Sequence, residues 1–308
     1  MTADTCMRSK YALITPVRDE EKYLPALIDS IVAQSIPPAR WLIVDDGSRD
    51  RTPEIVEGYA TRYSFIELVR LEPRENRLAG GEGAIPNALR RLDLTEFDFL
   101  ARFDADLIFG CDYIAKILDE FKRDPRLGVA GGGLYSEKNG SLQLERDPDH
   151  HVRGALKMYR RQCFSHIGGL STSIGWDTID EVSAWTKGWK TKSFYDFKVV
   201  HRRPTGTGIK ASAVYRERGK AEYLTWSDPW FVLAKSVKTA VTERSIIKPF
   251  SYIAGFLASY LRRLPRLDDR TFARVRREHQ RGRLASLLQG GRVGLEPAAA
   301  ASELSKSP

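Results

Sequence analysis

The first half of the 308-residue sequence alternates short apolar runs with longer segments whose apolar residues recur at helical spacing. The strand-like runs lie at residues 11–15, 41–44, 65–71 and 97–103, and the helix-like segments at residues 21–34, 52–63 and 84–92. Such alternation is typical of parallel strands joined by helices. The sequence therefore predicts an α/β fold with a mostly parallel sheet and helices on both of its faces.

Two aspartates follow the fourth apolar run at alternate positions. Asp104 and Asp106 come after residues 97–103, and a second apolar segment begins at Leu107. Ligands of open α/β sheets bind at the C-terminal ends of the strands. Two carboxylates there, with the rest of the coordination shell open, suit Mg²⁺ or Mn²⁺ carrying a diphosphate. A solvated Asp-x-Asp turn would have the same sequence, so the choice depends on the other motifs.

The composition is that of a globular protein from a reducing compartment. Hydrophobic residues make up 42% of the chain and charged residues 29%, which is ample material for a core. Cys6, Cys111 and Cys163 are few and widely spaced, which argues against a disulfide framework and favours the cytoplasm. Residues 1–10 lack the charged-then-apolar pattern of a secretory leader, so none is expected, and the absence of an apolar run of about 18 residues makes a membrane-spanning helix unexpected.

Positive charge is concentrated in the C-terminal third. Residues 202–283 contain 19 Lys or Arg against 7 Asp or Glu, a net charge of +12, whereas the whole chain carries +9. Trp226, Trp230 and Phe231 lie near lysines at the start of this region. Cations beside amphipathic rings favour peripheral attachment to the inner face of the cell membrane, with nucleic acid not expected as a partner. A helical extension with solvated charges is the alternative.

The alternation ends after residue 133, and this predicts further parts. Residues 136–153 are polar and are expected to form a long loop or an irregular hairpin. Beyond them we expect helices at 162–167 and 177–187 and two short strands at 190–194 and 197–201. The predicted division is a main domain over residues 1–205, a basic, mainly helical extension over 206–285, and a disordered tail over 286–308.

Four segments, in order, resemble the inverting family 2 glycosyltransferases of the GT-A fold. They are Thr15–Glu21 (TPVRDEE), Val44–Thr52 (VDDGSRDRT), Phe103–Asp106 (FDAD) and Gly175–Glu181 (GWDTIDE). The resemblance covers about residues 10–205. It implies a GT-A-type sheet and metal-assisted direct displacement, in which a sugar moves from a UDP- or GDP-linked donor to a glycan or lipid-linked acceptor.

The resemblance also assigns donor-binding roles to individual residues. The nucleotide pocket would be formed by Thr15, Pro16, Val17, Glu20, Asp45, Asp46, Arg77 and Asp104. Asp104 and Asp106 would hold the divalent metal, with His201 as a third ligand. His201 could instead simply close a strand, and Asp45 and Asp46 could belong to a plain turn before a helix. Relatives often carry a cation where this chain has Glu82, so Arg77 or Arg74 is expected to contact the phosphates.

The resemblance places the general base in the fourth segment. Asp177 lies eleven residues before Gly188, the usual position of that carboxylate, and Asp180 is the second candidate. Trp176 stands where the family usually has Glu, which keeps the choice open. Carboxylates at the start of a helix could also simply balance its dipole.

Two other functions are compatible with parts of the sequence. A sugar-phosphate nucleotidyltransferase shares an α/β nucleotide-binding core, but it expects a Gly-rich, cationic loop after the first strand, and residues 16–21 do not supply one. A non-catalytic basic module that binds membrane or nucleic acid would explain the charge alone. A metal-dependent thermal shift with UDP or GDP would favour the transferase over that module.

Overall fold

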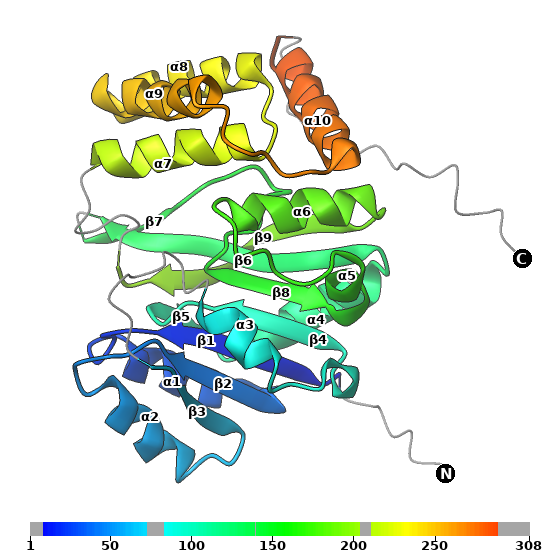
Figure 1. Ribbon diagram of the computed structural model, residues 1–308. Coiled ribbons are helices and arrows are strands. Elements are labelled where there is room, and N and C mark those ends of the chain that lie inside the picture. Colours follow the sequence, from blue (N-terminus) through cyan, green and yellow to red (C-terminus); the bar gives the residue numbers. More distant parts are fainter. Residues whose placement is uncertain (1–8, 73–82, 139, 204–210, 289–308) are drawn as a thin grey trace, which may run out of the picture. The chain divides into compact units, whose positions relative to one another are not determined.

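The computed structural model describes residues 9–72, 83–138, 140–203 and 211–288. The chain forms two compact units, and each consists of two stretches of sequence (Figure 1). The first unit is Met1–Thr172 with Thr191–Arg203, and the second is Ser173–Lys190 with Pro204–Pro308. The division expected at residue 205 stays a prediction. The grouping adds that helix α6, Trp176–Thr186, belongs with the C-terminal helices.

The first unit is built on one nine-stranded sheet with the order β3-β2-β1-β4-β8-β6-β9-β5, and β7 pairs with β6 outside this path. The strands are β1 Tyr11–Val17, β2 Arg40–Asp45, β3 Ile66–Arg70, β4 Phe99–Phe103, β5 Leu107–Phe109, β6 Leu127–Lys138, β7 Ser141–Leu144, β8 Leu156–Arg160 and β9 Lys190–His201. The first four strands in sheet order pair in parallel. Antiparallel pairs join β8 to β4, β8 and β7 to β6, and β9 to β5.

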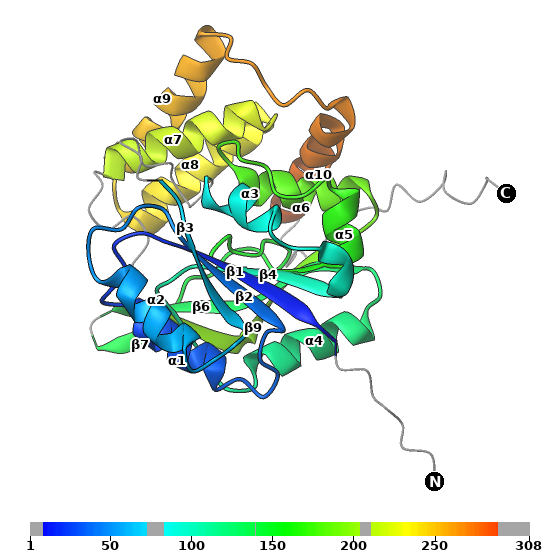
Figure 2. The ribbon, with the colours of Figure 1, turned by 60° about the horizontal axis from the view of Figure 1, so that its bottom comes forward.

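Helices cover both faces of this sheet, as the sequence predicts, and the α/β class is confirmed. Figure 2 shows α1, α2 and α4 along one face and α3 and α5 along the other. Their bounds are α1 Leu24–Val32, α2 Thr52–Ala60, α3 Ala84–Leu89, α4 Tyr113–Arg123 and α5 Arg161–His166. The core between sheet and helices is closed by large, fully buried side chains such as Trp41, Phe103 and Phe121. Their burial fixes which strand ends meet at the sheet edge.

Two segments of the first unit refine the sequence-based prediction. The polar stretch after residue 133 contains a hairpin in which β7 pairs with β6. The two short strands expected at 190–194 and 197–201 are one continuous strand, β9, because residues 195 and 196 contain no glycine or proline to break it. Its register places His201 opposite Leu107, one residue after Asp106. This pairing brings the end of β9 to the Asp-x-Asp segment.

The second unit is helical. It contains α6 together with α7 Ala211–Leu224, α8 Pro229–Glu243, α9 Ile247–Leu261 and α10 Arg270–Leu288. Helices α7 and α9 cross at two glycines, Gly219 and Gly255, where a side chain would collide with the other helix's backbone. Glu222 is buried and accepts hydrogen bonds from Lys235, Tyr252 and Arg276. Within the described ranges, every helix is too short or too polar to cross a bilayer.

Candidate active site

The C-terminal ends of β1, β2 and β4 lie side by side and carry most of the predicted site residues. Val17 pairs with Asp45, and Ile14 pairs with Arg102, so the three strands end close to one another. Glu20, Asp46 and the Asp104–Asp106 segment follow directly in the chain. Parallel packing therefore gathers carboxylates from distant parts of the sequence at one edge of the sheet.

Side chains of the Val44–Thr52 segment hold the loop that follows β1. Three of them accept hydrogen bonds from consecutive backbone N–H groups: Ser48 Oγ from Asp19 at 3.0 Å, Thr52 Oγ1 from Glu20 at 2.8 Å and Asp50 Oδ2 from Glu21 at 3.0 Å. Asp19 has a φ of 55° and returns the bond by accepting from the Arg49 N–H at 2.7 Å. The motif thus shapes both loops and fixes the direction of Glu20.

The predicted nucleotide-pocket residues divide by what their side chains do. Thr15 is fully buried and its Oγ1 accepts a hydrogen bond from the Trp41 indole at 3.0 Å, so this side chain belongs to the core. Asp45 is buried and accepts from the Ser48 N–H at 2.8 Å, which shapes the turn. Asp46 is also buried, and its Oδ1 has no hydrogen-bond partner among the described residues. Asp46 is therefore the carboxylate of this pair with an oxygen available to a ligand.

The other two residues predicted on β1 take part in the sheet. Pro16 pairs with Val44 of β2, and the Val17 carbonyl accepts a hydrogen bond from the Asp46 N–H at 2.9 Å. Their backbone is thus fixed beside the end of β2. Arg77, Arg74 and Glu82 lie outside the described residues.

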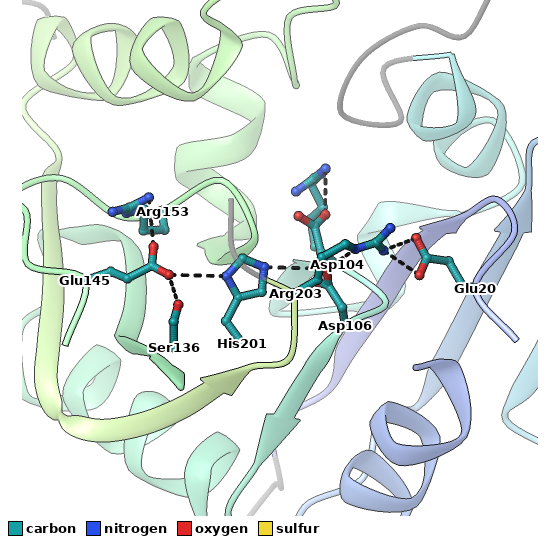
Figure 3. Close-up of polar contacts among 9 residues, drawn as sticks. Glu20, Asp104, Asp106, Ser136, Glu145, Arg153, His201 and Arg203 are labelled. Atoms are coloured by element: carbon teal, nitrogen blue, oxygen red, sulfur yellow. Dashed lines mark hydrogen bonds and ion pairs between the residues drawn. The ribbon is translucent and has the colours of Figure 1, made fainter. Parts of the chain in front are cut away.

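Asp106 is a buried carboxylate with two cationic neighbours (Figure 3). Its Oδ2 lies 3.1 Å from Arg203 Nε and 3.5 Å from His201 Nε2. Its Oδ1 is buried and has no hydrogen-bond partner in the described part of the chain. Burial raises the pKa of Asp106, but His201 and Arg203 outweigh it and the net shift is downward. The carboxylate is therefore ionised and has one oxygen to offer.

Asp104 presents its carboxylate more openly. Its side chain is 38% exposed, and Oδ1 lies 3.0 Å from Nη2 of the buried Arg102. The Asp104 N–H bonds to the Ala155 carbonyl at 2.8 Å, which fixes the turn after β4. Asp104 is thus held beside a cation without being enclosed.

His201 links Asp106 to a second polar cluster. Its Nδ1 lies 3.5 Å from Glu145 Oε1, and Glu145 also accepts from the Ser136 hydroxyl and lies 3.4 Å from Arg153 (Figure 3). Burial lowers the pKa of His201, but hydrogen bonds to Asp106 and Glu145 raise it to about 9 overall. The imidazole is therefore charged at neutral pH in this arrangement.

Arg203 connects the carboxylates of Glu20 and Asp106. Its Nη2 binds both carboxylate oxygens of the buried Glu20, while its Nε contacts Asp106 (Figure 3). Its guanidinium also lies 5.1 Å from the centre of the Tyr23 ring. The sequence analysis did not identify Arg203, Arg102 or Glu145. The only available signal for Arg203 was its place two residues after His201.

Asp104 and Asp106 bring oxygen donors to a place where a divalent metal could bind. Across the described ranges, no three His, Cys, Asp or Glu side chains are arranged to hold a metal ion. The oxygen of Asp106 without a partner and the half-open carboxylate of Asp104 are nevertheless the hard donors that Mg²⁺ and Mn²⁺ prefer. The two aspartates fit such an ion, whereas the role of His201 as third ligand stays a prediction.

The predicted base residues lie on α6 of the second unit. Gly175 precedes the helix with a φ of 85°, and Asp177 lies in the first turn, partly exposed. Asp180 is only 2% exposed, and its Oδ1 accepts from the Glu181 N–H at 2.8 Å. The two carboxylates therefore differ in their access to solvent.

The fold is shared with solved glycosyltransferases of the GT-A type. The mannosyltransferase PcManGT from Pyrobaculum calidifontis, solved with GDP-Man and Mn²⁺, is 18% identical, with a TM-score of 0.55 and coverage of 92% of this chain and 81% of that one. Residues 1–349 of TarS from S. aureus, solved with UDP-GlcNAc, give 15% identity, a TM-score of 0.56, and coverage of 93% and 94%.

The sequence comparison is more specific. Residues 12–174 match the family model of Glycosyl transferase family 2, and the chain belongs to this family. The minor teichoic acid biosynthesis protein GgaA of Bacillus subtilis is 23% identical over 72% of this chain and 50% of its own length. An uncharacterized glycosyltransferase of Mycoplasma pneumoniae is 30% identical over 54% of this chain and 59% of its own. The chain thus spans about half the length of these relatives.

Proposed function

We propose that this protein is an inverting glycosyltransferase that moves a sugar from a nucleotide diphosphate donor to an acceptor hydroxyl by metal-assisted direct displacement. One observation carries the proposal: Asp106 is ionised, buried and left with a free oxygen at the strand ends, and Arg203 connects it to Glu20. Diphosphates carrying a divalent ion bind where hard anionic ligands and cations alternate in this way.

The donor would lie along the ends of β1, β2 and β4. Asp46 Oδ1 and the Glu20 carboxylate could accept hydrogen bonds from the base or the ribose hydroxyls. PcManGT was solved with GDP-Man and TarS with UDP-GlcNAc, which supports a GDP- or UDP-linked sugar here. Arg203 would need to leave Glu20 or share it when the donor enters.

Asp104 and Asp106 would hold Mg²⁺ or Mn²⁺. Held by these two carboxylates, such an ion would supply Lewis-acid stabilisation of the charge on the leaving diphosphate. Mn²⁺ in the PcManGT structure supports this choice of cofactor. Arg102, which lies 3.0 Å from Asp104, would hold that carboxylate in place.

Asp177 is the proposed general base. Direct displacement needs a carboxylate that removes the acceptor proton as the hydroxyl attacks the anomeric carbon. Asp177 is partly exposed, whereas Asp180 is buried and already accepts a backbone hydrogen bond. These differences in access favour Asp177.

The acceptor would be a glycan or a lipid-linked sugar, and the enzyme would work at the inner face of the cell membrane. GgaA is named for teichoic acid biosynthesis, and another relative, from Nostoc, is a beta-monoglucosyldiacylglycerol synthase. The first name supports a glycan-type acceptor and the second a lipid acceptor. The net charge of +12 over residues 202–283 supports peripheral attachment to an anionic membrane.

Two measurements test this function. The full chain is incubated with UDP-glucose, UDP-GlcNAc and GDP-mannose, with Mn²⁺ or with excess EDTA, and nucleotide release is followed by mass spectrometry. We expect release from one donor only when the metal is present, and proton NMR of a transfer product should show an inverted anomeric centre. Turnover in EDTA would contradict the metal, and a retained configuration would contradict direct displacement.

A further inference from the structure

Large apolar side chains are exposed on two neighbouring helices of the second unit. In the described part of the chain, eleven such side chains are exposed, and ten belong to α8, α9 or the turn between them. The members on α8 are Trp230, Leu233, Val237 and Val241, and those on the turn and α9 are Ile246, Ile247, Phe250, Leu257, Tyr260 and Leu261. We call this set the apolar face. Scattered exposure is normal, but a concentration of this kind marks an interaction surface.

The apolar face is distinct from the face that holds the unit together. On α8 its members recur every three or four residues and so form one stripe, while Val232 points into the core. On α9, Tyr252 and Phe256 are buried, and Gly255 packs against Arg216 of α7. Each helix therefore packs against the unit with one apolar side and exposes a second one. Rotating a helix about its axis would bury the second side only by exposing the first.

Basic residues surround the apolar face. Residues 229–264 contain six Lys or Arg and one Glu, a net charge of +5. Lys238, Arg244, Arg262 and Arg263 are exposed along the hairpin. Lys235 of this segment binds the Glu222 carboxylate within the unit. This charge is complementary to an anionic surface, and it opposes pairing of the same face in a second copy of the chain.

We propose that the apolar face of α8 and α9 docks on an anionic lipid bilayer, with Trp230 and Phe250 entering the boundary between headgroups and acyl chains. Both helices are too short or too polar to cross the membrane, so they would lie in its plane. This rests on the peripheral attachment proposed above but not on the transfer chemistry. The proposal also assigns the membrane contact to a different set of residues from the one that the sequence analysis chose.

The sequence analysis chose Trp226, Trp230 and Phe231 for the same role, and the structure favours only Trp230 of these three. The Trp226 indole donates to the Leu267 carbonyl at 2.6 Å, and Arg266 lies 4.4 Å from its ring centre. Phe231 is partly buried, with Arg283 over its ring at 5.2 Å. These rings stabilise the unit, whereas Trp230 and Phe250 are 72% and 75% exposed and available to lipid.

Vesicle flotation of the full chain tests the proposal. The vesicles are phosphatidylcholine alone or phosphatidylcholine with phosphatidylglycerol. We expect binding to the anionic vesicles, and a loss of about tenfold or more in the variant Trp230→Ser/Phe250→Ser. Leu142→Ser is the matched control, since Leu142 is 51% exposed on β7, and it should bind like the wild type. Lys238→Gln/Arg262→Gln should weaken binding mainly at low salt.

A second readout locates the contact. Brominated lipids should quench part of the tryptophan fluorescence of the wild type, and Trp230→Phe should remove most of that quenching. Full binding by the Trp230→Ser/Phe250→Ser variant, or no binding by the wild type, would overturn the proposal. If the wild type instead formed a concentration-dependent dimer that the Trp230→Ser/Phe250→Ser variant did not form, the apolar face would be assigned to contact with a second copy of the chain. Donor hydrolysis in solution should be the same in this variant as in the wild type, which separates this test from the transferase assay.

Discussion

At the scale of single residues, Asp106 is the most constrained charge of the site. It is buried, it faces two cations through one oxygen, and its other oxygen has no partner among the described residues. A buried ionised group with spare acceptor capacity is stable only because cations compensate it. An added cation would therefore be bound most favourably at the second oxygen, Oδ1.

Asp106→Asn should abolish transfer and weaken Mn²⁺-dependent binding of UDP or GDP, because the amide is a poor ligand for a hard cation. Thermal shift with and without Mn²⁺ measures the binding, and circular dichroism checks the fold. The exposed Asp119→Asn is the charge-matched control. An unchanged Mn²⁺ response in Asp106→Asn would remove this residue from the metal site.

Asp177→Asn should lower the transfer rate by about 10²-fold or more with donor affinity little changed, as expected for loss of a base. Asp180→Asn should act differently: Asp180 is buried, so this change should lower the unfolding temperature more than the rate. Single-turnover rates and melting curves of both variants separate the two roles. Near-normal turnover by Asp177→Asn together with loss in Asp180→Asn would move the base to Asp180.

The sequence predicts some of these residues better than others. Asp104, Asp106 and Glu20 follow strands whose apolar periodicity marks where each strand ends, so their common edge could be predicted. Arg203 and Glu20 are 183 residues apart, and their contact depends on β9 pairing with β5. Such long-range pairing leaves no local pattern, which is why Arg203 and Glu145 were not foreseen.

At the scale of secondary-structure elements, the crossing of α7 and α9 depends on glycines. A Cβ at Gly219 would lie 1.9 Å from the Tyr252 carbonyl oxygen, and one at Gly255 would lie 2.0 Å from that of Arg216. Both contacts are with backbone, which can relieve them only if the helices separate. The helix propensities of these segments do not reveal this requirement.

Gly219→Ala or Gly255→Ala should therefore reduce the free energy of unfolding by about 3 kcal/mol or more. Gly58→Ala is the matched control, because Gly58 lies in α2 with open space around it. That change should stabilise the protein by about 0.5–1 kcal/mol through helix propensity. Denaturant unfolding of the three variants makes the comparison, and equal effects at Gly58 and Gly219 would contradict the close crossing.

At the scale of the whole molecule, the chain enters the second unit twice. Ile179, Val182 and Trp185 of α6 pack with Phe272 of α10, almost ninety residues further along by the sequence numbering. The unit therefore includes a helix that precedes residue 205 in the sequence. The basic segment of the sequence and this compact unit begin at different residues.

The stability of the whole chain should depend on pH through His279 of α10. Its ring lies 4.5 Å from that of Trp185, and burial, together with the charges of Arg283 and Arg276, lowers the pKa of His279 to about 4. The unfolded chain has the ordinary value of about 6.5, so between pH 6.5 and 4 it binds a proton that the folded chain does not. The contribution of His279 to stability is full above pH 6.5 and falls by up to about 3 kcal/mol on acidification through this range.

Denaturant unfolding at pH 7 and pH 5 measures this effect. His279→Gln should lose less stability than the wild type between these two values, because its side chain takes up no proton. His166→Gln, a change at an exposed position, controls for the loss of a histidine as such. Identical pH profiles for the wild type and His279→Gln would contradict the role of His279.

The loops after β1 and β2 are joined by hydrogen bonds between side chains of one loop and backbone N–H groups of the other. Each loop therefore depends on the other for part of its backbone hydrogen bonding. Donor preference could be changed by replacing loops with those of another enzyme. Both loops should then be replaced together. A single graft would introduce a segment whose supporting hydrogen bonds belong to a different protein.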